Sequence, residues 1–354
     1  MAMPPKKKQV DNTALRELKQ ALKAGAPRGL YVFHGEEAFL RDSYLAKLKD
    51  TVLPAGLEDF NLHAAKGKDC SAEWIEQAVD CLPVMSQRTL VLATDFDLFK
   101  QGDAAKERLL DILTNLPDYC TLVFVYDLLP YKPDGRSKLA ALLKKEGAVV
   151  DFQRQEQKTL AAWICRQFEK AGKRVDSADA EYLIFLAGDL MHDLSAEIEK
   201  AAAYAGHERV TRADMDAVCI PRVDAVVFQM TDAMARKDFD KAASVLADLL
   251  HSREAPVMIL SVMGKYFRQL YTARLYLDAG RGRGDFMALW GMKSGYPADK
   301  LLSAAKGFSL PWCRYAVRRC AETDIALKSA YGREGEVLTG LLMELASGRR
   351  LTFS

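Results

Sequence analysis

The chain has 354 residues, of which 49% are hydrophobic and 28% charged, so it is long enough for two or three globular domains and lacks the composition of a disordered protein. Its 50 Lys and Arg residues nearly balance its 48 Asp and Glu residues, which argues against a protein whose whole surface binds DNA. Residues 221–354 carry 20 Lys and Arg against 14 Asp and Glu, so this part is expected to be the side that approaches nucleic acid.

The cysteines and histidines give no sign of a metal site or a disulfide framework. The seven cysteines are odd in number and show no Cys-x-x-Cys spacing, and the five histidines lie far apart. No stretch reaches the ~18 apolar residues that a membrane helix needs. We therefore expect a reduced, cytoplasmic protein with no metal, cofactor or membrane contact.

The first 150 residues alternate short β-rich runs with stretches of helical periodicity. Helices are predicted at 13–24, 71–82, 104–115 and 137–145. Strands are predicted at 30–33, 61–65, 89–93, 121–126 and 148–152. Continuous apolar strands that alternate with helices predict an α/β domain whose parallel sheet is covered on both faces.

From residue 158 onward the strand signal disappears and the pattern is helical, with an interruption at Pro221. Long helices are predicted at 226–235, 239–250 and 256–279. The aromatic residues of the last of these are interleaved with basic ones, but their helical spacing favours a core stripe over a DNA-binding surface. We expect three domains: an α/β domain (1–152), a small helical domain (153–221) and an all-helical domain (222–354).

The stretch "LYVFHGEEAFLRDSY", residues 30–44, has the order of a phosphate-binding loop: strand, glycine, helix. A working loop needs Gly-x-x-x-x-Gly-Lys-Ser/Thr, because backbone N–H groups surround the phosphates while the lysine and the hydroxyl bind phosphate and magnesium. With Gly35 as the first glycine, the other positions hold Leu40, Arg41 and Asp42. Leu40 would crowd the approach of the phosphate, Arg41 lacks a compact ammonium, and Asp42 would repel a polyphosphate. The sequence therefore predicts a degenerate loop that does not bind ATP.

The predicted strand 121–126 gives a second test of ATP chemistry. Asp127 follows this strand, but the next residue is Leu128, so no carboxylate stands there to activate water. We interpret Asp127 as the residue that opens a turn.

Several segments between residues 31 and 332, taken in order, resemble the delta subunits of bacterial DNA polymerase III, a clamp-loader family of AAA+ architecture. The segments are "YVFHGEEAFLRD", "CLPVMSQRTLVL", "AWICRQFEKAGKRV", "LAGDLMHDLSAEIEKAAAYAG", "VFQMTDAMARKDFDKAASVLADLL", "APVMILSVMGKYFRQL" and "ETDIALKSAYG". The resemblance implies that the α/β domain is a degenerate AAA+ domain, that residues 153–221 form a helical lid and that residues 222–354 form an all-helical collar. It implies a protein that opens the sliding clamp (beta subunit) without hydrolysing ATP. It also implies a hetero-oligomeric ring with ATP-binding clamp-loader subunits and delta-prime, which acts on primed DNA. No catalytic residue is then expected here, and a nucleotidyltransferase activity would belong to the polymerase holoenzyme.

The resemblance supplies a third test, because ATP-using relatives carry a Gly-Asp-x-Arg motif whose arginine reaches the nucleotide. Here Gly188 and Asp189 are present, but Met191 stands at the arginine position. A thioether makes no useful contact with phosphate. The Ser-Arg-Cys tripeptide, which in such assemblies sends an arginine into a neighbour's ATP site, is absent from the sequence.

The segment "DCLPVMSQRTLVL" is the best candidate for a binding site. Pro83 stops the preceding helix, and apolar Leu82, Val84 and Met85 stand beside polar residues at the tip of an element, as in a plug for a partner's hydrophobic pocket. In the delta family the clamp-contacting pair of large apolar or aromatic residues occupies this place, so the resemblance assigns clamp binding to Val84 and Met85, with Leu82 and Pro83 as support. Neither member of the pair is aromatic here. The competing interpretation is that these side chains cap the sheet core.

Tyr331, in a stretch of the basic C-terminal part that contains several glycines, is a candidate for stacking on DNA.

Two other function classes stay open at this point. One is a divergent P-loop NTPase, and the other is a helical DNA-binding adaptor without a clamp partner.

Overall fold

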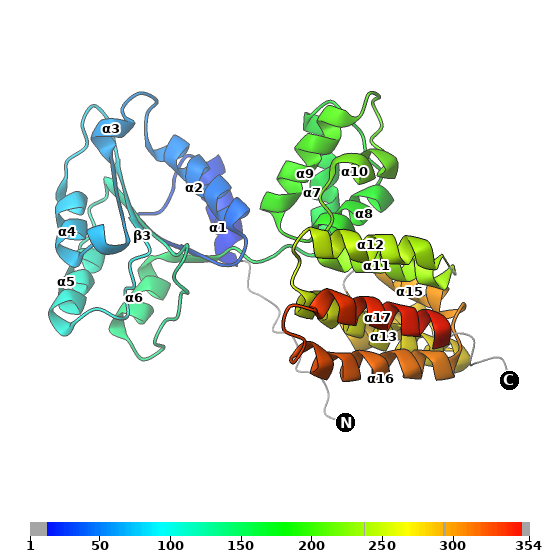
Figure 1. Ribbon diagram of the computed structural model, residues 1–354. Coiled ribbons are helices and arrows are strands. Elements are labelled where there is room, and N and C mark those ends of the chain that lie inside the picture. The colour runs from blue at the N-terminus through cyan, green and yellow to red at the C-terminus, as the bar shows by residue number, and fades with distance from the viewer. Residues whose placement is uncertain (1–12, 237, 293–294, 349–354) are drawn as a thin grey trace. The chain divides into compact units, whose positions relative to one another are not determined.

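A computed structural model describes residues 13–236, 238–292 and 295–348 of the chain (Figure 1). The chain divides into two compact units, one up to Arg154 and the other from Gln155 onward. The predicted division into three domains, with boundaries after residues 152 and 221, stays a prediction. In the described ranges, no helix is both long and apolar enough to cross a membrane.

The first unit contains a five-stranded parallel sheet with the strand order β2-β3-β4-β1-β5. The strands are β1 (Leu30–His34), β2 (Leu62–Lys66), β3 (Thr89–Thr94), β4 (Cys120–Val125) and β5 (Ala148–Asp151). The predicted parallel sheet is therefore confirmed. Because β1 lies between β4 and β5, the chain reverses its direction across the sheet beside β1, which is where open α/β sheets bind ligands.

Helices cover both faces of this sheet (Figure 1). On one face Val32 and Phe124 pack with α4 (Ala72–Asp80), α5 (Asp103–Thr114) and α6 (Lys138–Glu146). On the other, Phe33 and Val123 pack with α1 (Thr13–Lys23) and α2 (Ala38–Val52). Alternation along each strand thus serves two cores, which explains why the strands are almost continuously apolar.

Two element boundaries differ from the prediction, one at the end of α4 and one at the start of β2. The helix predicted at 71–82 is α4, which starts after the cap Ser71 and ends at Asp80, two residues earlier. The strand predicted from residue 61 starts at Leu62, because Asn61 closes a one-turn helix, α3 (Glu58–Asn61). The first difference leaves exposed Cys81 and Leu82 outside the helix, and the second places Asn61 in α3 and not in the sheet.

In the described residues of the second unit the regular elements are all helices, apart from one isolated bridge between Arg174 and Arg209. Its helices are α7 (Gln157–Lys170), α8 (Ser177–Ala187), α9 (Met191–Tyr204), α10 (Arg212–Val218), α11 (Val223–Ala235), α12 (Phe239–His251), α13 (Pro256–Asp278), α14 (Arg283–Trp290), α15 (Gly295–Ala305), α16 (Leu310–Leu327) and α17 (Glu334–Gly348).

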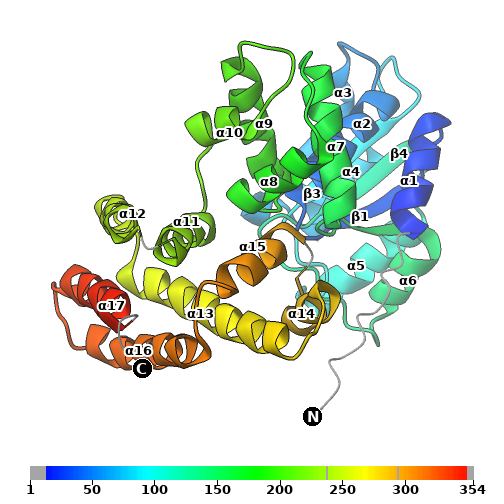
Figure 2. The same ribbon diagram turned by 90° about the vertical axis from the view of Figure 1, so that its right-hand side faces the viewer.

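The long helix α13 is central to the core of this unit and packs against α11, α15 and α16 (Figure 2). Its aromatic residues Tyr266 and Phe267 are buried, and Tyr271 and Tyr276 pack against the same core. The aromatic stripe is thus a core feature, as its spacing predicts, and not a nucleic-acid surface.

Candidate partner-binding site

The turn between β1 and α2, where a phosphate would bind, is packed against the chain that follows β5. Gly35 has φ +122°, and a Cβ at this position would lie 2.4 Å from the carbonyl oxygen of Phe152. The N–H of Glu37 donates to the same carbonyl at 2.8 Å. Gly35 is therefore required for a close backbone contact within the protein.

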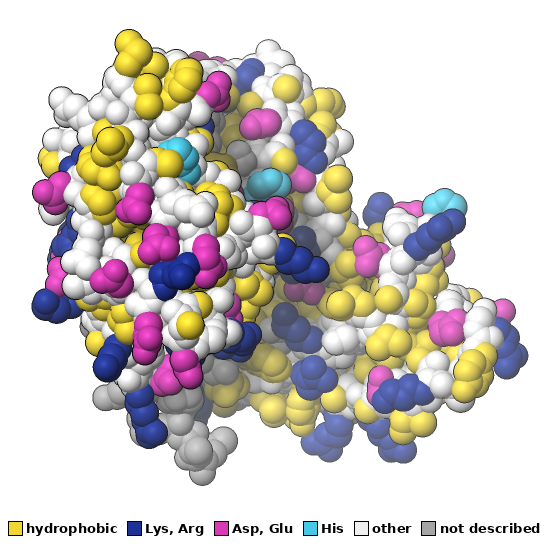
Figure 3. Space-filling model, turned by 90° about the vertical axis from the view of Figure 1, so that its left-hand side faces the viewer, with side chains coloured by type: hydrophobic (Ala, Val, Ile, Leu, Met, Phe, Trp, Pro, Cys, Tyr) yellow, Lys and Arg dark blue, Asp and Glu magenta, His cyan; other side chains and the backbone are white. Residues whose placement is uncertain are grey.

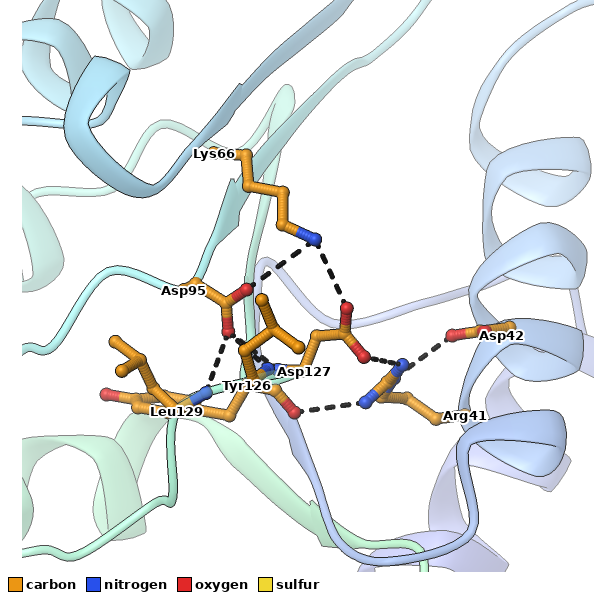
Figure 4. A network of polar contacts seen from close by, with 8 residues as sticks. Arg41, Asp42, Lys66, Asp95, Tyr126, Asp127 and Leu129 are labelled. Atoms are coloured by element: carbon orange, nitrogen blue, oxygen red, sulfur yellow. Dashed lines mark hydrogen bonds and ion pairs between the residues drawn. The ribbon is translucent and has the colours of Figure 1, made fainter. Parts of the chain in front are cut away.

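Arg41, at the position of the phosphate-loop lysine, is only 4% exposed and points into the protein (Figure 4). Its guanidinium donates to Asp127 Oδ1 at 2.7 Å, to the carbonyl oxygen of Tyr126 at 3.1 Å and to Asp42 Oδ1 at 3.0 Å. Leu40 packs against the core beneath α1 and α2. The side chains that replace the phosphate-loop signature are thus engaged in internal contacts.

Asp127 does follow a strand and open a turn, and it belongs to the same polar network. Lys66 Nζ lies 3.2 Å from Asp127 Oδ2 and 3.6 Å from Asp95 Oδ2 (Figure 4). Partial burial acts to raise the pKa of Asp127, but hydrogen bonds from Arg41 and Lys66 outweigh it and hold that pKa below its ordinary value. Two cations, Arg41 and Lys66, therefore compensate the charge of the Asp127 carboxylate.

Asp95 organises this turn and was not singled out by the sequence. Its Oδ1 accepts the backbone N–H groups of Asp127, Leu128 and Leu129 at 2.9, 2.8 and 3.1 Å. The available signal was an aspartate directly after the apolar run 89–94. Its carboxylate fixes the loop after β4, so Leu128 has a structural role through its N–H while its side chain is exposed.

In the second unit, Met191 is the first residue of α9 and is buried in the protein. Gly188, three residues before Met191, has φ +99° and caps the C-terminus of α8. The segment that aligns with the arginine motif is thus a helix-to-helix turn with a core methionine.

The segment between α4 and β3 projects apolar side chains into solvent. Leu82 is 71% exposed, Val84 46% and Met85 85%, while Pro83 is half-buried. Figure 3 shows exposed hydrophobic side chains on the outer face of the first unit. The interpretation that these residues cap the sheet core is wrong, because exposed side chains cover no core. We call residues 82–85 the apolar tip.

One side chain outside the apolar tip bonds its backbone, and two more fix the turn that follows the tip. Asn61 accepts the N–H of Val84 at 2.8 Å and donates to its carbonyl oxygen at 3.0 Å. Ser86 Oγ donates to the carbonyl oxygen of Arg88 at 3.0 Å, and Arg88 Nη1 donates to that of Pro27 at 3.0 Å. The tip is therefore an exposed segment on an ordered base. Asn61 escaped the sequence analysis because its partner lies 23 residues away.

The comparison with protein families identifies the chain. The family model for the DNA polymerase III delta subunit matches residues 31–153, and the one for the C-terminal domain of the same subunit matches residues 224–345. The chain belongs to the DNA polymerase III delta subunit family. The family assignment expected from the sequence is thus confirmed over more than half of the chain.

Individual delta subunits are similar to this chain over most of their length. The DNA polymerase III subunit delta of Bacillus subtilis (strain 168) is 22% identical over 336 residues, which cover 92% of this chain and 95% of the relative. The probable subunit delta of Aquifex aeolicus (strain VF5) is 25% identical over 288 residues, 79% of this chain and 80% of the relative.

A solved structure is similar as well. The Bacillus subtilis DNA clamp loader delta protein superposes with a TM-score of 0.53 at 19% identity, and the match covers 94% of this chain and 99% of that one. The likeness confirms the fold class of this delta-family member: a part with a parallel sheet and covering helices, followed by a mostly helical C-terminal part.

Tyr331, the candidate DNA contact, lies in the loop between α16 and α17. Its side chain is 88% exposed, and its φ of 35° is rare for a bulky residue. Gly332 follows with φ 83°. The loop thus presents one aromatic ring to solvent.

Proposed function

We propose that this delta-family chain binds a sliding clamp, the beta subunit, through the apolar tip and favours the open form of the clamp for loading onto primed DNA. In the same proposal it works in the cytoplasm, in a ring with ATP-binding clamp-loader subunits and delta-prime. The observation that carries the proposal is the exposure of Leu82, Val84 and Met85 on an ordered base. Large apolar groups at an element tip are unfavourable in water unless a partner covers them.

The energy available from this contact is limited. Burying Val84 and Met85 in a partner's pocket contributes roughly 3–5 kcal/mol at most. Methionine is unbranched and adapts to an irregular pocket, which suits a pair without an aromatic member. The rest of the affinity comes from the polar surface around the tip, such as Ser86 and Gln87.

The proposal assigns no ATP hydrolysis and no bound nucleotide to this chain. Arg41 and Asp127 bind each other, and Lys66 bridges Asp127 and Asp95. A polyphosphate at this edge would have to displace Arg41 from these contacts and would meet the carboxylate of Asp42. Clamp opening then requires only that the tip bind the open clamp more tightly than the closed one.

The test is the double substitution Val84→Asp with Met85→Asp. We expect it to abolish clamp binding in surface plasmon resonance, because two carboxylates cannot enter an apolar pocket without a large desolvation penalty. The fold should survive, since both side chains are exposed and aspartate tolerates the left-handed backbone of Met85 better than most residues.

The chain offers a matched control in Val257 and Met258, a second exposed Val and Met pair at the start of α13. Val257→Asp with Met258→Asp adds the same charge at a helix N-terminus, where it is tolerated. The control should bind the clamp as the wild type does. Equal clamp affinity of the tip variant and the control would refute the proposal.

A further inference from the structure

Asn61 is a fully buried polar residue whose side chain serves the apolar tip. It is the last residue of α3 and has 0% exposure. Its carboxamide oxygen accepts the N–H of Val84 at 2.8 Å, and its nitrogen donates to the carbonyl oxygen of Val84 at 3.0 Å. A carboxamide presents an acceptor oxygen and a donor nitrogen side by side, which matches the adjacent N–H and carbonyl groups of one backbone residue. Both polar backbone groups of one tip residue are therefore held by one side chain.

The remaining hydrogen bond of the Asn61 side chain is local and does not involve the sheet. The same nitrogen donates to the carbonyl oxygen of Leu57 at 3.0 Å, within the turn of α3. In the described part of the chain, Asn61 thus bonds its own turn and the tip, and no strand of the sheet. A residue that only supported the core would be expected to bond the core elements.

The backbone beyond Val84 adopts a conformation that needs support. Met85 has φ 52°, in the left-handed region that residues other than glycine rarely adopt. Strain of this kind persists where the surroundings fix it, and such positions cluster at functional sites. Two segments flank Met85 and are both held by hydrogen bonds: Val84 by Asn61, and the turn from Ser86 to Arg88 by the Ser86 hydroxyl. Together they fix Met85 with its side chain in solvent.

We propose that Asn61 is a positioning residue for the apolar tip: it holds Val84 so that Val84 and Met85 face the clamp in their binding geometry. The inference rests on the proposed clamp-binding function and adds a residue that does not itself touch the clamp. A segment that is ordered before binding loses less conformational entropy on binding, so the grip raises the affinity. The same grip makes the tip rigid in the free protein.

The test compares Asn61→Ala with the wild type in two measurements. Amide hydrogen exchange at Val84 should become at least tenfold faster, because its N–H loses its acceptor. Clamp affinity in surface plasmon resonance should fall about tenfold, because the tip must be ordered on binding. Unchanged exchange at Val84, or unchanged affinity beside a binding wild type, overturns the inference.

Two further variants keep the test decisive. Leu143→Ala removes a buried side chain of α6 in the same unit, away from the tip, and should destabilise the unit while clamp affinity stays at the wild-type level. Affinity that falls equally in Leu143→Ala would reduce Asn61 to a general structural role. If Asn61→Ala does not fold, Asn61→Asp replaces it in the test, because aspartate keeps an acceptor for the N–H of Val84 but loses both donors. The clamp affinity of Asn61→Asp should lie below that of the wild type, and equal affinities overturn the inference. A wild type that does not bind the clamp refutes the proposed function itself, and the inference falls with it.

Discussion

Arg41 is the residue that most clearly distinguishes the carboxyl edge of this sheet from a phosphate-binding site. A phosphate-loop cation points toward a ligand, but this guanidinium is buried and donates to Asp127, Asp42 and the carbonyl oxygen of Tyr126. The sequence already placed the wrong residue types in this loop. It could not indicate that Arg41 would bond a residue 86 positions away, because that contact exists only once β1 and β4 are paired.

Arg41→Ala should lower the free energy of unfolding by about 2–3 kcal/mol at pH 7, since it removes charge-assisted hydrogen bonds from a buried site. The loss should shrink as the pH falls. The pKa of Asp127 is held below its ordinary 3.8 in the folded protein, so the stability from this group is present above that pH and disappears as the pH falls through the lowered pKa.

Urea unfolding of wild type and variant at pH 7 and near pH 3 measures this difference. The two proteins should differ less at the lower pH. A difference in unfolding free energy that is the same at both pH values would mean that the Arg41 to Asp127 pair carries no such stabilisation.

At the scale of elements, the predictable parts are those set by periodicity. The five strands and the seven helices that were given bounds lie within about three residues of those bounds, because most of them bury a regular apolar pattern. The prediction missed the C-terminal end of α4 and the first residue of β2. Leu82 and Val84 look like core residues by composition, and only Pro83 signals that the helix stops before them. The support from Asn61 is a tertiary contact that no local pattern contains.

The loop between α16 and α17 carries a prediction of its own. If Tyr331 stacks on DNA, Tyr331→Ala should weaken binding of primed DNA by the assembled clamp loader about fivefold or more, since a base stacked on an aromatic ring contributes about 1–3 kcal/mol. Tyr331→Phe keeps the ring and should bind as the wild type does. Fluorescence anisotropy with labelled primed DNA measures both, and an alanine variant of wild-type affinity would exclude the stacking role.

At the scale of the whole molecule, the chain combines a nucleotide-type sheet whose ligand edge holds internal ion pairs with an exposed apolar tip. The sheet and the family could be predicted from the sequence, because order of segments and apolar periodicity survive at low identity. The hydrogen bonds at the sheet edge and at the apolar tip could not be predicted, since they join residues that are far apart in the sequence, such as Arg41 with Asp127 and Asn61 with Val84. In the proposed account the chain supplies binding energy, and its ATP-binding neighbours decide when the tip is accessible.

The most direct test of this account is retention of the purified protein on immobilised sliding clamp, with and without ATP. The account predicts equal retention in both conditions, because the tip is ordered without a nucleotide and the chain holds none. The Val84→Asp with Met85→Asp variant should not be retained, while the Val257→Asp with Met258→Asp control should be. Retention that requires ATP, or that survives the loss of the apolar tip, would contradict the account.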